Sequence, residues 1–427
     1  MSIARAVTVA DLRRLARRRL PRAVFDFIDG GADEELTLRA NSADYDSILL
    51  EQRVLTDVGA TRLDRPILGK PAAAPLLIAP TGLANMAFPD ADLVLAREAA
   101  AAGIPLVAST SSGARLEDIA AVGPGRRWFQ LYVFRDRAIT EGLIARARAA
   151  GYEALVLTVD VPVVGRRRRD VRNGFTIPLT LTPSSLLDFA LHPRWCFDIW
   201  RHGVPQMNNF AEALALSGAA SHAALMNAQL DPQVDWGIVP WLRSRWDGPL
   251  LIKGVLSVAD AVTAIDAGFD GIIVSNHGGR QLDGVPSTIR ALARIAPAVA
   301  GRVPLLIDSG IRRGSDLVKA VALGADAVLI GRPTLYAIAA GGAAGVRHCL
   351  QILFDDLHRT LAQIGRPALA AVDRTVLLDG SVPTEGGSPA AGGSPAEGSM
   401  PAQGSVPANG SVPRTHPPAT VSARPRP

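Results

Sequence analysis

The stretch "VPLLIDSGIRRGSDLVKAVALGADAVLIGRP" (residues 303–333) places two short apolar runs on either side of a helical pattern. Both runs, 303–310 and 327–333, are rich in leucine, isoleucine and valine and have the length of buried strands. The alanine-rich segment between them ends at Gly324, a residue type suited to the C-terminal end of a helix. The stretch therefore predicts a strand, a helix and a second strand parallel to the first.

Runs of the same kind recur along the chain, separated mostly by alanine-rich amphipathic segments. They lie at 75–80, 104–110, 127–133, 154–160, 249–254 and 271–279. Three of the intervening segments also end at a glycine: Gly103, Gly151 and Gly268. Eight buried strands with helices between them predict an α/β protein with a (β/α)8 TIM barrel. A doubly wound open sheet is the alternative, and the count of eight strands argues against it.

The segments around the strand pattern suggest how the chain is divided. We expect a helical N-terminal segment at 1–66 that packs on a barrel formed by 67–370. The connection from 161 to 248 is much longer than the others, so the loop after the fourth strand carries an insertion at about 174–213. Insertions at that end of a barrel belong to the active-site face.

The two ends of the chain differ in composition. Near the N-terminus we expect a helix that begins at Thr8 and has three leucines on its inner face: Leu12, Leu15 and Leu20. The basic N-terminus lacks the apolar core of a signal peptide, and no run reaches the ~18–20 apolar residues that span a bilayer. The imperfect Gly-Ser-x-Pro repeat at 378–427 predicts a disordered tail, with partner docking as the alternative.

Charge and cysteine content narrow the classes of partner. The net charge of +5 permits anionic substrates or lipid surfaces, but the arginines are scattered and no aromatic-basic strip suggests nucleic acid. The only cysteines, Cys196 and Cys349, predict no disulfide framework and a cytoplasmic location, with the inner face of the cell membrane as the other possibility. No His/Cys/Asp spacing suggests a metal site.

Polar residues follow every predicted strand, where a barrel carries its catalytic groups. They are Thr81, Gly82, Ser109, Thr110, Gln130, Tyr132, Thr158, Asp160, Lys253, Ser275, His277, Arg280, Asp308, Gly331 and Arg332. After the last two strands, Arg312 and Arg332 stand close to glycines, whose backbone N–H groups are accessible to a ligand. Arginines and backbone N–H groups together predict a phosphate site. Surface arginines that cap helix ends are the alternative.

His277 is the candidate general base. Gly278 and Gly279 free it from strand pairing, and an imidazole titrates near neutral pH. Asp160 could stabilise the imidazolium, and Arg280 and Arg167 could each present a fork to a carboxylate.

Five segments together resemble the FMN-dependent L-2-hydroxy-acid oxidases and dehydrogenases, over about residues 5–370. They are "SNHGGRQLDG", "FQLYV", "LTVDVPVVGRRRRD", "IKG" and "DSGIRRGSD". The insertion "LHPRWCFDIWRHGVPQMNNF" (191–210) resembles that of membrane-associated members that oxidise mandelate. The resemblance implies bound FMN, oxidation of an aryl or bulky 2-hydroxy acid to the 2-keto acid, a quinone-type acceptor and a homo-oligomer, commonly a tetramer.

The resemblance also implies roles for single residues. His277 would be the base, Asp160 its charge partner, and Lys253 would lie beside the flavin. The substrate would be bound by Tyr132, Arg167, His277, Arg280 and the position of Phe27. The cofactor would be bound by Pro80, Thr81, Gly82, Ser109, Gln130, Thr158, Lys253, Ser275, Asp308, Ser309, Gly310, Ile311, Arg312, Gly331 and Arg332.

Three positions bear on the subtype. Phe27 stands where the family usually has a tyrosine that binds the substrate carboxylate. Either the two arginines suffice and Phe27 packs, or the substrate differs. Gly82 is typical of members that do not use O2, and Ser111 replaces a tryptophan of the glycolate-oxidising members, which leaves room for an aryl group.

Three alternatives remain open at this stage. An O2-using oxidase, including one for lactate-like acids, would have the same motifs. A flavin-binding docking protein without turnover is a further alternative, supported only by Phe27. The aromatic and cationic insertion favours peripheral membrane contact through 174–213, although a lid or subunit contact would have a similar composition.

Overall fold

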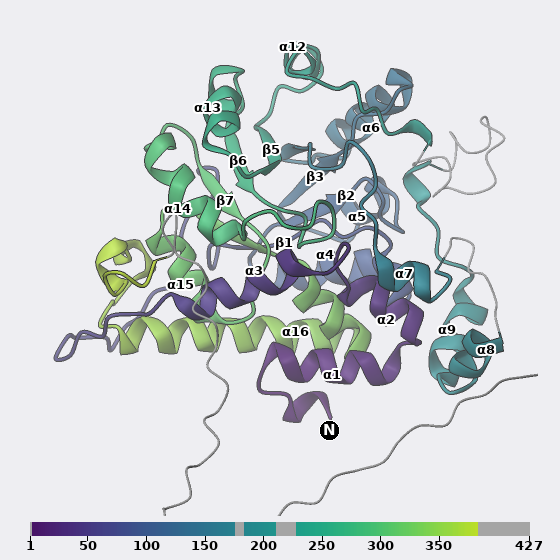
Figure 1. The fold of residues 1–427 in the computed structure, drawn as a ribbon, viewed down its shortest axis with the longest axis horizontal. Coiled ribbons are helices and arrows are strands. Elements are labelled where there is room, and N and C mark those ends of the chain that lie inside the picture. The colour runs from purple at the N-terminus through teal and green to yellow at the C-terminus, as the bar shows by residue number, and fades with distance from the viewer. Residues whose placement is uncertain (1, 176–182, 211–227, 383–427) are drawn as a thin grey trace, which may run out of the picture. The chain divides into compact units, whose positions relative to one another are not determined.

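The computed structural model describes residues 2–175, 183–210 and 228–382, and eight parallel strands in it close into a barrel in chain order (Figure 1). The strands are β1 (Leu76–Ile78), β2 (Leu106–Ser109), β3 (Arg127–Leu131), β4 (Ala154–Thr158), β5 (Leu250–Val255), β6 (Gly271–Val274), β7 (Leu305–Ile307) and β8 (Ala327–Ile330). Each lies within or overlaps a predicted run, so the predicted TIM barrel is confirmed. The predicted tail lies outside the described residues from 383 onward.

Helices follow the strands as the sequence predicts. They are α4 (Ala91–Ala101), α5 (Leu116–Ala120), α6 (Arg137–Ala149), α12 (Ile238–Arg243), α13 (Val258–Asp266), α14 (Thr288–Val299), α15 (Gly314–Ala322) and α16 (Arg332–Gln363). The four glycines expected after helices all have positive φ, which confirms them as helix ends: Gly103, Gly151, Gly268 and Gly324.

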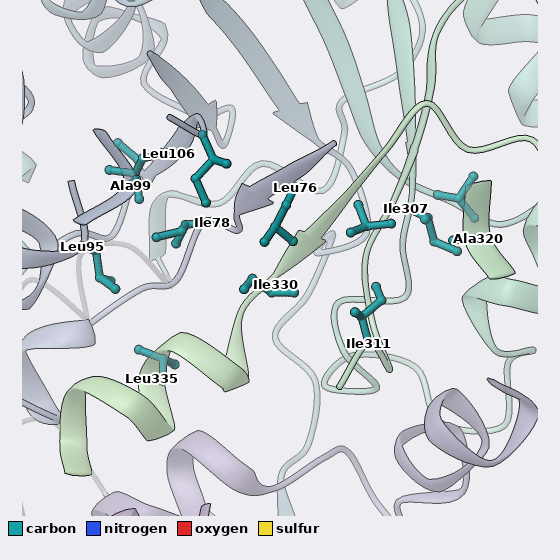
Figure 2. Packing of buried hydrophobic residues seen from close by; sticks show 14 of the residues in the cluster. Leu76, Ile78, Leu95, Ala99, Leu106, Ile307, Ile311, Ala320, Ile330 and Leu335 are labelled. Atoms are coloured by element: carbon teal, nitrogen blue, oxygen red, sulfur yellow. The ribbon is translucent and has the colours of Figure 1, made fainter. Parts of the chain in front are cut away.

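Both faces of the sheet are buried, the inner face in the interior of the barrel and the outer face against the surrounding helices. Leu77 and Leu329 point into the barrel, with Trp128 and Leu306 among the residues that fill it. Their neighbours along the strands point outward against the helices (Figure 2). That second layer includes Leu76, Ile78, Leu95, Ile330 and Leu335. The alternation arises because successive side chains of a strand point to opposite faces.

The N-terminal segment forms α1 (Val9–Arg19), α2 (Arg22–Asp29) and α3 (Leu36–Ser47). The predicted start at Thr8 is confirmed, because its hydroxyl accepts from the Asp11 N–H and the Asp11 carboxylate accepts from the Thr8 N–H. Leu12 and Leu20 are buried, and Leu15 is partly buried. In Figure 1, α1 (purple) lies beside α16 (green), which it contacts.

Among the described residues, α16 alone is long and apolar enough to cross a membrane, by length and composition only. It packs against α1, α4 and α15, and half of its most apolar window is buried. Its helical geometry is also interrupted at Gly342, where φ is +58°. This packing accounts for its apolar side chains.

Asp29, the last residue of α2, is the centre of an ion-pair network that joins distant segments. Arg13 donates to both of its carboxylate oxygens, at 2.5 and 2.8 Å. The Tyr336 hydroxyl and Arg169 also donate to it, at 2.7 and 3.0 Å. Burial raises the pKa of Asp29, but the hydrogen bonds from Arg13 and Tyr336 lower it by more, so that the pKa is about 2. The network ties α1, α2, α16 and α7 (Arg168–Arg172), which comes just before the insertion, together.

Asp29→Asn should therefore destabilise the fold in a pH-dependent way. The folded pKa of about 2 lies below the ordinary value of 3.8 for an aspartate, so the ionised carboxylate stabilises the fold above about pH 4. We expect a loss of about 2 kcal/mol at pH 7 that shrinks as the pH falls from 4 towards 2. Urea unfolding of the variant and the unmodified protein between pH 2 and 7 measures it.

The exposed pair Arg62–Asp64 provides the matched control. Asp64→Asn should change stability much less, because water screens that pair. A loss for Asp29→Asn that is independent of pH would contradict the role given to its charge.

Candidate active site

His277 and Asp160 meet at the C-terminal ends of β6 and β4. The His277 Nδ1 lies 2.9 Å from the Asp160 Oδ1. His277 has a φ of +58°. This left-handed conformation is energetically unfavourable for any residue other than glycine, and such residues cluster at functional sites. Burial raises the pKa of Asp160, but the nearby charges of His277 and Lys253 more than offset this, and the pKa is lowered. The pair can hold a proton on the imidazole against a carboxylate that stays ionised.

Lys253, on β5, is buried in a chain of polar contacts. Its Nζ lies 3.0 Å from the Asp308 Oδ2 and donates to the Ser275 hydroxyl at 2.8 Å. Burial lowers its pKa, but the charges of Asp308 and Asp160 raise it more, so the ammonium stays protonated. The Ser309 hydroxyl donates to Asp308 and accepts from the Gly278 N–H. A fixed positive charge therefore lies at the mouth of the barrel.

Gln130 and Thr158 each carry a buried polar atom without a hydrogen-bond partner among the described residues. These atoms are the Gln130 Nε2 and the Thr158 Oγ1. The Gln130 Oε1 is held by the Thr110 N–H at 3.2 Å and the Ser109 hydroxyl at 3.3 Å, so the amide is oriented. Buried polar groups are nearly always paired, so these two are suited to a polar ligand edge.

The two arginines expected at the substrate are held close to Phe27. The Arg280 Nη1 donates to the carbonyls of Phe27, at 2.6 Å, and Gly30, at 3.1 Å. The Arg167 Nε lies 3.0 Å from the Asp170 Oδ2. Both guanidiniums lie near the Phe27 ring, with their Cζ atoms 5.3 Å (Arg167) and 5.2 Å (Arg280) from its centroid.

Two adjoining cavities open onto these residues. Both are lined by Phe27, Pro80, Gly82, Leu83, Lys253, His277 and Arg280. The first also has Thr81, Asp308, Ser309, Gly310, Ile311, Arg312, Gly331 and Arg332 in its lining. The second, of about 760 Å³, also has Ser109, Ser111, Gln130, Tyr132, Thr158 and Arg167. Of the predicted site residues, Thr110, Asp160 and Ser275 line neither cavity. Asp160 contacts His277, and Ser275 accepts a hydrogen bond from Lys253.

The expected phosphate end lies in the first cavity, where α15 and α16 begin. The structure shows three contacts of Arg332 that the sequence did not indicate: its guanidinium donates to the carbonyls of Ile28, Gly278 and Gly30. Within the described part of the chain, the Arg312 side chain donates one hydrogen bond, to the neighbouring Ile311 carbonyl at 2.8 Å. Arg312 is therefore the better placed of the two to bind an anion.

Two residues of the motif "SNHGGRQLDG" have contacts that sequence reasoning missed. The Gln281 Oε1 accepts from the Gly165 N–H at 2.7 Å, which joins the loops after β6 and β4. Asp283 accepts from the Thr37 N–H at 2.8 Å and so caps the start of α3. Both residues stand inside the quoted motif, so the sequence marked them as candidates. It could not indicate their partners, which are distant in the sequence.

No group of three or more His, Cys, Asp or Glu side chains among the described residues could hold a metal ion. The described histidines other than His277 lie in or beside α9 and α16, away from both cavities.

Comparison with known proteins places the chain in context. Residues 16–379 match the family described as FMN-dependent dehydrogenase. The chain is 46% identical to (S)-mandelate dehydrogenase of Pseudomonas putida over 88% of this chain and 94% of that relative. It is 44% identical to an L-lactate dehydrogenase of Caulobacter vibrioides, over 87% and 97% of the two chains.

Solved structures agree with these relatives. A structure described as the monotopic membrane protein (S)-mandelate dehydrogenase has a TM-score of 0.84 and 45% identity, covering 88% of this chain and 99% of that one. A mandelate oxidase structure has a TM-score of 0.72 and 39% identity, covering 87% and 98%.

The backbone at Gly279 gives a test of how the site is held. With φ at +70°, an added Cβ would lie 2.7 Å from the Leu38 backbone nitrogen in α3. Gly284 also has positive φ, at +84°, but a Cβ there would contact nothing within 4 Å. Both alanine variants incur the left-handed penalty of about 1–2 kcal/mol, and Gly279→Ala should lose clearly more because α3 must shift. Chemical denaturation of both variants measures the difference, and equal losses would contradict the close packing of α3 on this loop.

Proposed function

The chain belongs to the FMN-dependent dehydrogenase family, and on that premise we propose that it oxidises a 2-hydroxy acid with an aryl or similarly bulky side group to the 2-keto acid. We further propose a quinone-type electron acceptor. The observation that carries the proposal is that His277, whose Nδ1 lies 2.9 Å from the Asp160 carboxylate, lines the same cavity as Arg167 and Arg280. A base and two carboxylate-binding forks on one cavity fit an acid whose hydroxyl stands next to its carboxylate.

FMN is the cofactor of the family, and the residues present fit it. The unpaired Gln130 Nε2 and Thr158 Oγ1 would bind polar edges of the ring system. Lys253 would place its ammonium where the ring gains negative charge, and Arg312 with the starts of α15 and α16 would hold the phosphate. When bound, FMN supplies a two-electron acceptor.

His277 would take the proton that leaves the substrate, and Asp160 would stabilise the imidazolium that results. Arg167 and Arg280 would hold the carboxylate and so orient the substrate's carbinol carbon. Burial raises the pKa of Tyr132 well above its ordinary value, so its hydroxyl stays protonated as a donor to the substrate. Each of these roles uses a group that already lines, or contacts a residue that lines, the second cavity.

Apolar lining supports a bulky side group. The second cavity is bordered by Leu83, Val161, Val164, Phe175 and Met207, and Ser111 occupies little of it. Burying an aromatic ring against such surface is favourable by about 25 cal/mol per Å². The mandelate relatives support an aryl acid, and the lactate relative supports a small one.

Gly82 supports an acceptor other than O2. Gly82 lines both cavities, and a Cβ at this position would lie 3.0 Å from the Ser111 Cβ. The dehydrogenase relatives favour the same conclusion, while the mandelate oxidase structure keeps an O2-using oxidase as the second candidate.

Anaerobic mixing of the FMN-loaded protein with (S)-mandelate and with L-lactate tests the activity. We expect flavin bleaching and stoichiometric keto acid, faster with mandelate. His277→Asn should slow the bleaching by about 10²–10⁴-fold, because general base catalysis is lost, while FMN stays bound. Absence of bleaching with every 2-hydroxy acid would overturn the proposal, and peroxide formed as fast in air as a quinone is reduced would make the protein an oxidase.

We also propose that the insertion contacts a membrane surface. It includes α8 (Pro183–Ala190) and α9 (Pro193–His202), and α7 (Arg168–Arg172) comes just before it. Large apolar side chains on α8, on α9 and in the turn between them are exposed: Leu187 by 66%, Leu191 by 71%, Phe197 by 52% and Trp200 by 80%. Apolar and aromatic side chains beside arginines suit an interfacial helix pair. The monotopic mandelate dehydrogenase supports the same location.

Replacing Phe197 and Trp200 by serine should weaken binding to lipid vesicles at least about tenfold, because two apolar side chains no longer enter the interface. Co-sedimentation with vesicles containing anionic lipid measures it. Leu55→Ser is the matched control, since Leu55 is fully exposed outside the insertion. Unchanged sedimentation of the double variant would contradict the proposed contact.

A further inference from the structure

Phe27 is the centre of an aromatic and cationic cluster at the second cavity. The Cζ atoms of Arg167 and Arg280 lie 5.3 and 5.2 Å from its ring centroid, within the ~6 Å range of cation–π contacts. Phe175 stacks on it with centroids 4.7 Å apart and planes 17° apart. The ring is therefore held on one side by another aromatic residue and attracts both cations.

Each of the two arginines is anchored through part of its guanidinium. Arg280 uses its Nη1 for the carbonyls of Phe27 and Gly30, and Arg167 uses its Nε for Asp170. Within the described part of the chain, the other guanidinium nitrogens of both arginines make no hydrogen bond. Those donors remain for a ligand in the cavity that both arginines line.

Two cations so close together repel each other. Burial, followed by the charges of Arg167 and Arg332, lowers the pKa of Arg280. The face of an aromatic ring attracts a cation without accepting a hydrogen bond, so Phe27 can hold both guanidiniums and leave their N–H groups free. An aliphatic side chain of similar size would fill the space but would not attract either cation.

We infer that Phe27 is a positioning residue whose ring holds Arg167 and Arg280 together so that their unpaired N–H groups bind one substrate carboxylate. The inference rests on the proposed function and names how the site recognises its substrate. Phe27 has no hydroxyl, so it contributes to carboxylate binding through the arginines rather than by a hydrogen bond of its own.

The test uses the FMN-loaded protein and a pair of probes that cannot be oxidised. In 2-hydroxy-2-phenylpropanoate a methyl group replaces the α-hydrogen. In its amide, which is similar in size and shape, an uncharged NH2 group replaces one carboxylate oxygen and removes the negative charge. Dissociation constants come from the change in flavin absorbance on binding. We expect Phe27→Leu to raise the Kd of the carboxylate about tenfold, which corresponds to about 1.4 kcal/mol, and that of the amide less than about twofold.

Phe27→Tyr provides the conservative rescue, because the ring is kept. It should bind the carboxylate within about threefold of the unmodified protein or more tightly, since a hydroxyl donor is added. Phe88→Leu is the matched control: Arg19 lies 5.8 Å from the Phe88 ring, and neither residue lines the two cavities. It should change neither Kd.

Two results would overturn the inference: an unchanged carboxylate Kd in Phe27→Leu, or an equal loss for carboxylate and amide, which marks general damage to the cavity. Both are distinct from failure of the proposed function, which would show as no flavin bleaching by any 2-hydroxy acid in the unmodified protein.

Discussion

The carbonyl groups of three residues at the end of α2, Phe27, Ile28 and Gly30, accept hydrogen bonds from arginine side chains of the barrel. Arg280 donates to the carbonyls of Phe27 and Gly30, and Arg332 donates to those of Ile28 and Gly30. The end of a helix leaves carbonyl groups without helical partners and carries partial negative charge, so it is a favourable place for guanidiniums. The barrel mouth is thus completed by a segment that lies some 250 residues earlier in the chain than Arg280.

The strands and the site residues at their ends could be predicted because both follow local rules. Strands buried on two faces appear as apolar runs, and parallel strands bring their C-terminal ends to one rim. The placement of His277 and Gln130 on the cavities follows directly. The contacts of Asp283 and Gln281 could not be predicted, because their partners lie more than 100 residues away and no local pattern indicates them.

The network around Asp29 shows the same limit. Its sequence neighbourhood predicts only the end of a helix, whereas Arg13, Arg169 and Tyr336 reach it from three other segments. Likewise, the sequence predicts that Arg332 binds an anion, but it gives no sign of the hydrogen bonds that its guanidinium also donates to three backbone carbonyls. An arginine at a helix start has the same sequence signal whether it binds a ligand or the protein's own backbone.

The Gly30 carbonyl accepts from both Arg280, which faces both cavities, and Arg332, which lines only the first. The two ends of the site therefore share one acceptor on a segment outside the barrel. This constrains how such proteins can diverge. If relatives exchanged their N-terminal segments by recombination, the exchanged segment would bring the carbonyl groups that hold both arginines. It would also bring residue 27, which on our proposal positions the arginines that bind the substrate carboxylate. Inheritance of specificity is then partly separate from inheritance of the barrel.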